Sequence, residues 1–216
     1  NKSWWQVYGL GQLGEVEDII YPNWQEISEV PKEARLERRY LDYGYTNDPT
    51  AIGDIYKWND SWVVDELMYQ TRMLNPAIID FIKQQQIQVM VAADSAEPKS
   101  NDELALGGIA VIPALKGPDS VWYGIQKVQQ QKIFYTARSR NIRKERLAYI
   151  WLRDRNGVLV RTAKGHTVPI GNNNHQMDGI RYGFESLLMS VAPDVVRLQK
   201  QRWEHNRSSM SLNSAK

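Results

Sequence analysis

Residues 88–100 read Gln-Val-Met-Val-Ala-Ala-Asp-Ser-Ala-Glu-Pro-Lys-Ser, an apolar run that stops at an aspartate and leads into a helix start. A short, nearly all-apolar run is typical of a central strand covered on both faces, so we expect a strand over Gln88–Ala93. Asp94 then stands at the end of that strand. A carboxylate in this position is costly unless it is exposed at the sheet edge or binds a cation. The stretch therefore predicts a buried sheet with an acidic group at one edge.

Three β-rich apolar runs precede this strand, and turn-forming residues separate them. They cover Arg39–Tyr43, Ala51–Trp58 and Ser61–Tyr69. This pattern predicts a meander of antiparallel strands. Asn75-Pro76 then reads as an N-cap followed by proline at the first helical position.

Helices and strands alternate after Asp94. We expect helices over 99–106, 119–132, 142–153 and 174–189, and short strands over 109–114 and 133–136. Ser100 and Glu103 have the spacing of a capping box for the first of these helices. Strands followed by alternating helices and strands predict an α/β sandwich with a mixed sheet.

The two ends of the chain differ from its middle. Residues 1–34 hold aromatic clusters among Gly and Pro, which predicts an irregular lead-in segment that packs on the core. Residues 35–190 form the main predicted domain. Residues 191–216 hold the predicted helix end and a Ser-rich tail that we expect to be disordered. Because the chain begins with Asn1 rather than Met, we expect it to be part of a longer protein.

Composition excludes several kinds of site. The 216 residues include no Cys and three His, which removes disulfides, thiolate zinc sites and cysteine nucleophiles. A metal site would have to use Asp and Glu oxygens, which favour hard ions such as Mg²⁺ or Mn²⁺. No apolar run approaches the roughly 18 residues of a membrane span, and there is no signal peptide.

Charge is distributed unevenly along the chain. Residues 1–120 carry 10 Lys and Arg against 19 Asp and Glu, whereas residues 121–216 carry 17 against 6. A basic half predicts a polyanionic partner. Much of its charge lies on or next to one predicted helix, at Arg138, Arg140, Arg143, Lys144 and Arg146. Acidic partners nearby in the sequence are few, so phosphate contacts are favoured over a merely solvated helix face.

Three aspartates stand where a strand ends or a helix begins. Asp42 ends the first predicted strand, and Gly44 beyond it allows close backbone approach. Asp94 ends the central strand, and Asp178 lies one turn after His175 on the same face of the last helix. Each aspartate alone is better explained as a turn residue or a helix cap. Together they match the carboxylates that a two-metal phosphodiesterase needs.

The sequence around these residues resembles the nuclease domain of the large terminase subunit of tailed bacteriophages. The matching blocks are Leu41–Ala51, Ala93–Ser100 and Asn174–Tyr182, of which the middle one is the most specific. The resemblance covers roughly residues 1–190. It implies an RNase H-like, RuvC-type α/β fold, with a mixed central sheet flanked by helices on both faces.

The resemblance also implies an activity. Domains of this family cut concatemeric viral DNA into genome units during packaging, and the implied cofactor is Mg²⁺ or Mn²⁺ in a two-metal site. Asp42, Asp94 and Asp178 match the metal-binding triad, and His175 matches the histidine one turn before its last member. The implied partners are double-stranded DNA, the ATPase domain of the same full-length subunit, the portal protein and the small terminase subunit. The implied location is the host-cell cytoplasm, with no membrane involved.

The sequence departs from the family pattern at one point. Gly179 follows Asp178 where relatives commonly carry Asp-Ala or Asp-Asp, which puts a fourth carboxylate in doubt and leaves Glu97 as a candidate acting through a water. The chain also has no Walker motif, G-x-x-x-x-G-K-[ST], so we expect the nuclease half without the packaging ATPase.

Two other functions remain open at this stage. Asp42, Gly44 and Thr46 also fit the phosphate-binding turn of actin-like phosphotransferases, but neither a second Asp-Gly phosphate loop nor a Gly-rich adenosine motif follows. The second alternative is a non-catalytic module that docks on DNA or on the portal, and the presence of all three aspartates argues against it.

Overall fold

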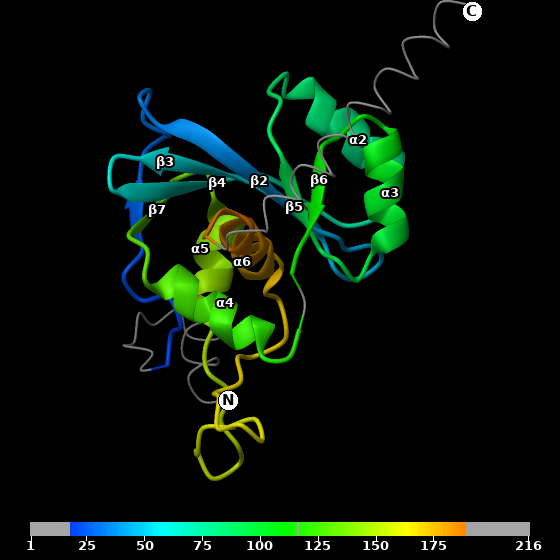
Figure 1. Cartoon of the computed structure of the whole chain (residues 1–216). Coiled ribbons are helices and arrows are strands. Elements are labelled where there is room, and N and C mark those ends of the chain that lie inside the picture. Colours follow the sequence, from blue (N-terminus) through cyan, green and yellow to red (C-terminus); the bar gives the residue numbers. More distant parts are fainter. Residues whose placement is uncertain (1–17, 116, 189–216) are drawn as a thin grey trace, which may run out of the picture.

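The computed structural model describes residues 18–115 and 117–188, which build a seven-stranded mixed β-sheet (Figure 1). The order of the strands across the sheet is β1-β7-β4-β3-β2-β5-β6. They are β1 Gln25–Ile27, β2 Arg35–Asp42, β3 Thr50–Trp58, β4 Ser61–Gln70, β5 Val91–Ala93, β6 Val111–Pro113 and β7 Ile133–Thr136. β2, β3 and β4 pair antiparallel, and the other neighbours pair parallel. The predicted meander and mixed sheet are confirmed.

Helices cover both faces of the sheet, as expected. They are α2 Asn75–Gln84, α3 Pro98–Leu106, α4 Ser120–Gln129, α5 Arg140–Ala148 and α6 His175–Leu188. α4, α5 and α6 lie on one face, and α2 and α3 lie on the other (Figure 1). Successive side chains of β2 point into the hydrophobic cores on opposite faces of the sheet, because strand side chains alternate between faces. Tyr40 belongs to the core beneath α6, and Leu41 belongs to the core beneath α2 and α3.

The described part of the lead-in segment, residues 18–34, has side chains in the core. Ile20, Tyr21 and Trp24 are buried, and the Tyr21 and Trp24 rings stack with centroids 4.9 Å apart. The expectation of a wholly irregular segment is wrong for Gln25–Ile27, because these residues form β1 by pairing with β7. A strand of three residues depends on that distant partner, which local sequence does not reveal. The predicted tail, 191–216, and residues 1–17 lie outside the described residues.

One helix ends earlier than the sequence predicts. We expected a helix over 142–153, but α5 ends at Ala148 because Tyr149 adopts an extended backbone. Ile150 then bridges to Ile19, and the next residue, Trp151, bridges to Pro169. Tertiary pairing therefore replaces the last turn of the predicted helix.

Both predicted side-chain caps are wrong. α2 begins at Asn75 with Leu74 in the capping position, and α3 begins at Pro98, so Ser100 lies inside its first turn. The side-chain amide of Asn75 instead donates a hydrogen bond to Glu103 at 2.7 Å. The two residues therefore join α2 to α3 rather than capping them.

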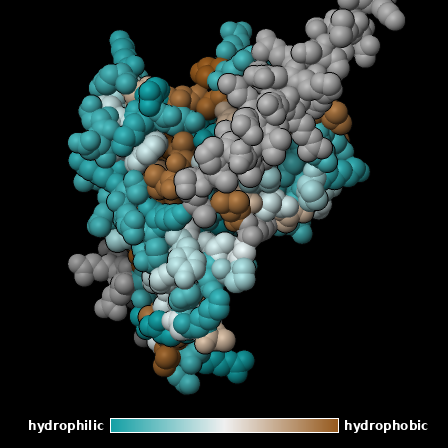
Figure 2. Space-filling model, in the orientation of Figure 1, coloured by the Kyte–Doolittle hydropathy of each residue, from teal (hydrophilic) through white to brown (hydrophobic). Residues whose placement is uncertain are grey.

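The outer surface of the described residues is largely polar in the view of Figure 2, with hydrophobic residues in small, separate groups. No described helix is both long enough and apolar enough to cross a membrane.

Candidate active site

Asp42 and Asp94 lie at the same edge of the sheet. Their preceding residues, Leu41 and Ala93, are register partners on the parallel strands β2 and β5. Asp42 is the last residue of β2 and is buried, while Asp94 directly follows β5 and is partly exposed. This register places the two strand-end carboxylates next to each other, as neighbours on adjacent strands.

The loop after Asp42 requires a glycine. An added Cβ at Gly44 would lie 2.3 Å from the carbonyl oxygen of Asp48 and 2.4 Å from that of Pro49. The close backbone approach expected at Gly44 is therefore present, and it folds the loop 43–49 back toward the site.

α6 brings the other two predicted residues to this edge. The helix packs across β2, β3 and β5, and its first turn carries His175 and Asp178. Nδ1 of His175 lies 3.0 Å from Oδ2 of Asp42, and its Nε2 lies 3.6 Å from Oδ1 of Asp48. The imidazole therefore stands between a buried carboxylate and an exposed one.

The carboxylates at this edge disfavour one another's charge. Burial raises the pKa of Asp42 to about 6; the nearby carboxylates of Asp178 and Asp94 add to the rise, and the hydrogen bond from His175 opposes it. That hydrogen bond in turn raises the pKa of His175. Negative charge at Asp42 is thus costly until a proton or a cation compensates it.

Each remaining aspartate has a protein partner. Asp178 accepts hydrogen bonds at 2.9 Å from Arg181 and at 2.9 Å from Asn174, and Asp94 accepts one at 2.8 Å from the backbone N–H of Ala96. Within the described ranges, no three carboxylate or imidazole groups stand together as a ready metal cluster. The donor set is nevertheless one of hard oxygens around a buried negative charge, which fits Mg²⁺ or Mn²⁺ once these side chains turn toward an ion.

Packing explains the glycine that follows Asp178. A Cβ added at Gly179 would lie 2.4 Å from Cδ2 of Tyr40, a contact that real Cβ atoms essentially never make. Tyr40 is fully buried on β2, so its ring has little room to move. A fourth carboxylate therefore does not fit at position 179. The role expected of Glu97 stays a prediction.

The sequence reasoning missed Glu145. It lies on α5 among basic residues, but its side chain is buried. Its carboxylate accepts hydrogen bonds from the first turn of α6 and from Tyr69. Burial raises the pKa of Glu145 to about 7, although these hydrogen bonds oppose the rise. The sequence did contain a signal for this burial. Glu145 follows the apolar Ile142 by three residues, which places both on the same face of α5.

The structure divides the five predicted DNA-contacting residues. Arg146 is buried and donates to the carbonyl oxygen of Tyr21, and Arg138 makes a two-point ion pair with the buried Asp65. These partners come from other elements, which is why the local sequence does not show them. Arg140, Arg143 and Lys144 are exposed, with Arg143 3.8 Å from Glu26. We therefore keep only these last three in the proposed interface.

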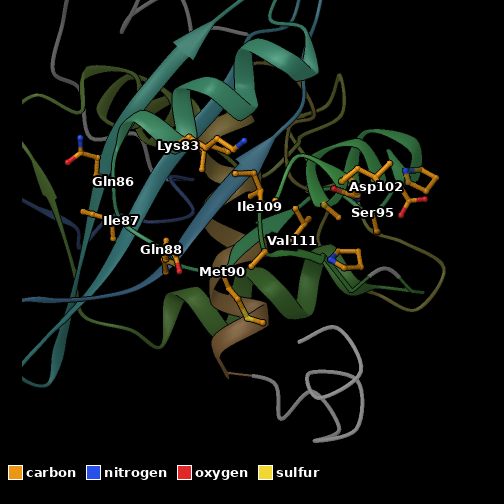
Figure 3. Close-up of a pocket in the computed structure, with 18 residues that line it drawn as sticks. Lys83, Gln86, Ile87, Gln88, Met90, Ser95, Asp102, Ile109 and Val111 are labelled. Carbon is orange, nitrogen blue, oxygen red and sulfur yellow. The ribbon is translucent and has the colours of Figure 1, made fainter. Parts of the chain in front are cut away.

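A cavity of about 950 Å³ lies on the α2 and α3 side of the sheet. It is lined by the C-terminal part of α2, the segment 86–90, α3 and the segment 108–111 (Figure 3). Ser95, next to Asp94, reaches its wall, but none of Asp42, Asp94, Asp178 and His175 lines it. The acidic edge of the sheet and this cavity are therefore separate features of the molecule.

The sheet order, the acidic edge and helix α6 together define an RNase H-like fold of the terminase nuclease type. Residues 42–186 match the family described as "Terminase RNAseH like domain", and the chain belongs to that family.

Comparison with individual relatives agrees. The chain is 30% identical over 159 residues to the large terminase subunit of Bacillus phage SPP1; the match covers 68% of this chain and 35% of that protein. The chain thus spans about a third of the length of this relative.

Solved structures show the same fold. The SPP1 large terminase nuclease domain with bound Mn has a TM-score of 0.62 at 24% identity, covering 77% of this chain and 97% of that one. The large terminase of a thermophilic bacteriophage has a TM-score of 0.63 at 24% identity, covering 80% and 45%. The P22 large terminase nuclease domain has a TM-score of 0.57 at 16% identity, covering 80% and 92%.

Proposed function

We propose that this chain is the nuclease part of a terminase large subunit, a metal-dependent endonuclease that cuts concatemeric viral DNA into genome units during packaging. The observation that supports the proposal is that Asp42 and Asp94 follow register partners at one edge of the sheet, and that the charge of Asp178 lies near enough to add to the raised pKa of the buried Asp42. Carboxylates that raise one another's pKa are suited to share a bound cation. The family match favours a nuclease role for such a site.

Asp42, Asp94 and Asp178 would hold Mg²⁺ or Mn²⁺. When bound as a pair, such ions stabilise the attacking and leaving oxygens of an in-line phosphodiester displacement. His175 would donate its Nδ1–H to the Asp42 carboxylate and so orient it. The other ring nitrogen, Nε2, faces Asp48 and would be free to accept or release a proton. Arg140, Arg143 and Lys144 would contact backbone phosphates of double-stranded DNA.

The proposed wider setting is that of a DNA-packaging machine. The ATPase domain of the same full-length subunit, the portal protein and the small terminase subunit are the proposed partners, acting in the host-cell cytoplasm. The family match favours this function over an actin-like phosphotransferase. A non-catalytic docking module is left as an outcome of the test.

The deciding experiment is nicking of supercoiled plasmid by the wild-type chain in Mn²⁺, in Mg²⁺ and in excess EDTA. Nicked and linear products are expected with the metals and none with EDTA. Asp94→Asn, purified identically, controls for contaminating nuclease and should be inactive. DNA binding without cleavage in every metal would identify a docking module and overturn the proposal.

A further inference from the structure

The buried carboxylate of Glu145 joins three elements next to the acidic edge. Its side chain comes from α5 and is only 2% exposed. Oε2 accepts hydrogen bonds from the backbone N–H groups of Gln176 at 2.6 Å and Met177 at 3.3 Å, at the start of α6. Oε1 accepts a hydrogen bond from the hydroxyl of Tyr69 on β4 at 2.7 Å. One side chain thus fixes α6 to α5 and to the sheet.

This arrangement stabilises the start of α6 from outside the helix. The first N–H groups of a helix have no intrahelical acceptor, and a negative charge near them also interacts favourably with the helix dipole. Asn174, which precedes α6, directs its side-chain amide nitrogen to Asp178. Glu145 therefore satisfies N–H groups that would otherwise be left buried and unpaired.

The residues that Glu145 holds lie between the two functional residues of the helix. His175 precedes Gln176, and Asp178 follows Met177. The Tyr69 ring, which Glu145 also holds, lies edge-on to the His175 ring with centroids 6.5 Å apart. A shift of this turn would displace the hydrogen bond from His175 to Asp42 together with the Asp178 carboxylate.

We propose that Glu145 is a positioning residue for the nuclease reaction. Together with Tyr69, it sets the first turn of α6 so that His175 and Asp178 face Asp42 and Asp94. This inference rests on the proposed function, but it concerns geometry that metal binding also reports.

Glu66 provides a matched control, because it stabilises a different helix by the same chemistry. Its Oε2 accepts hydrogen bonds from the backbone N–H groups of Asn141 at 2.8 Å and Ile142 at 3.1 Å, at the start of α5. Its Oε1 accepts one from the side chain of Asn141. Neither residue held by Glu66 belongs to α6. Glu145 lies on the same helix as these two residues, one turn further along. Loss of Glu66 should therefore destabilise the start of α5 to a similar extent but displace His175 and Asp178 much less than loss of Glu145 does.

The experiment compares Glu145→Ala, Glu145→Gln and Glu66→Ala with the wild type. Cleavage is measured in a single turnover at saturating DNA, Mn²⁺ affinity by calorimetry, and stability by denaturation. Because small misplacements of reacting groups are costly, Glu145→Ala should cut about 10- to 100-fold more slowly and bind Mn²⁺ more weakly, at unchanged DNA affinity. Glu145→Gln keeps an acceptor oxygen and should recover most of the rate. Glu66→Ala should lose stability but cut within about twofold of wild type.

The inference is overturned if Glu145→Ala cuts and binds Mn²⁺ like wild type, if Glu145→Gln is as impaired as Glu145→Ala, or if Glu66→Ala loses as much rate. Should Glu145→Ala not fold, Tyr69→Phe removes only the hydroxyl and should slow cleavage by about fivefold, the worth of one hydrogen bond. An unchanged rate in that variant then also overturns it. If the wild type binds Mn²⁺ without cutting DNA, the proposed function fails, and the Mn²⁺ affinities alone decide the role of Glu145.

Discussion

Asp42 and Asp94 lie side by side because Leu41 and Ala93, which precede them, are register partners on parallel strands. That relationship brings two carboxylates together, and the burial of Asp42 makes its charge costly in the absence of a cation. A purely structural aspartate would instead be stabilised by its surroundings. The stability of a variant without the Asp42 charge therefore distinguishes a cation-binding role of Asp42 from a structural one.

Asp42→Asn should abolish cleavage and Mn²⁺ binding while leaving the fold intact. In EDTA at pH 8 it should be at least as stable as the wild type, because the amide removes a charge that the folded state disfavours. Urea denaturation and calorimetry measure the two effects. A large loss of stability in EDTA would show that the carboxylate is needed for folding.

His175→Ala should lower the cleavage rate more than it lowers DNA affinity, because the imidazole contacts Asp42 and is not part of the proposed phosphate-binding set. Single-turnover cleavage and equilibrium binding on the same duplex provide the comparison. A variant that binds and cuts like the wild type would assign His175 to packing at the helix start.

Gly179→Ala should destabilise the protein by about 1–3 kcal/mol, the usual cost of overpacking, because its Cβ would collide with the Tyr40 ring. Gly171→Ala is the matched control, since an added Cβ there meets no atom within 4 Å. The loss should shrink in a Tyr40→Leu background, where the ring is absent. Equal stabilities of the two alanine variants would contradict the packing explanation.

The sequence predicts the acidic edge better than it predicts what surrounds it. Asp94 follows an apolar run, and Asp178 follows His175 at helical spacing, so both positions are visible locally. Glu145 looks like one acid in a basic helix, and its role exists only because α6 starts against α5. Arg146 shows the same limit, since a cation is normally expected in solvent and here donates to Tyr21 in the core. Long-range packing decides both cases.

Glu145 should also leave a signature in the pH dependence of stability. Its pKa is raised from an ordinary value of 4.5 to about 7 by burial, so the folded state holds the proton more tightly than the unfolded chain does. As pH rises from 4.5 through 7, the wild type should therefore lose stability relative to Glu145→Gln, by at most about 3 kcal/mol. Below pH 4.5 this contribution is fully present. Urea denaturation of both proteins in EDTA at several pH values measures this contribution. A stability difference between wild type and Glu145→Gln that does not vary with pH would contradict a raised pKa at Glu145.

The exposed cations of α5 should bind the phosphate backbone of duplex DNA independently of its sequence. Replacing Arg140, Arg143 and Lys144 by Gln should weaken binding to all sequences alike and flatten its salt dependence by a slope of about 0.9 per lost phosphate contact. Arg138→Gln is the matched control, because Asp65 already compensates that charge, and it should change the slope little. Binding isotherms on two unrelated duplexes over a range of salt concentrations test both points.

Weakening of binding to only one of the two duplexes would instead indicate base readout, because phosphate contacts carry no sequence information. An unchanged slope in the triple variant would show that this face of α5 meets another partner.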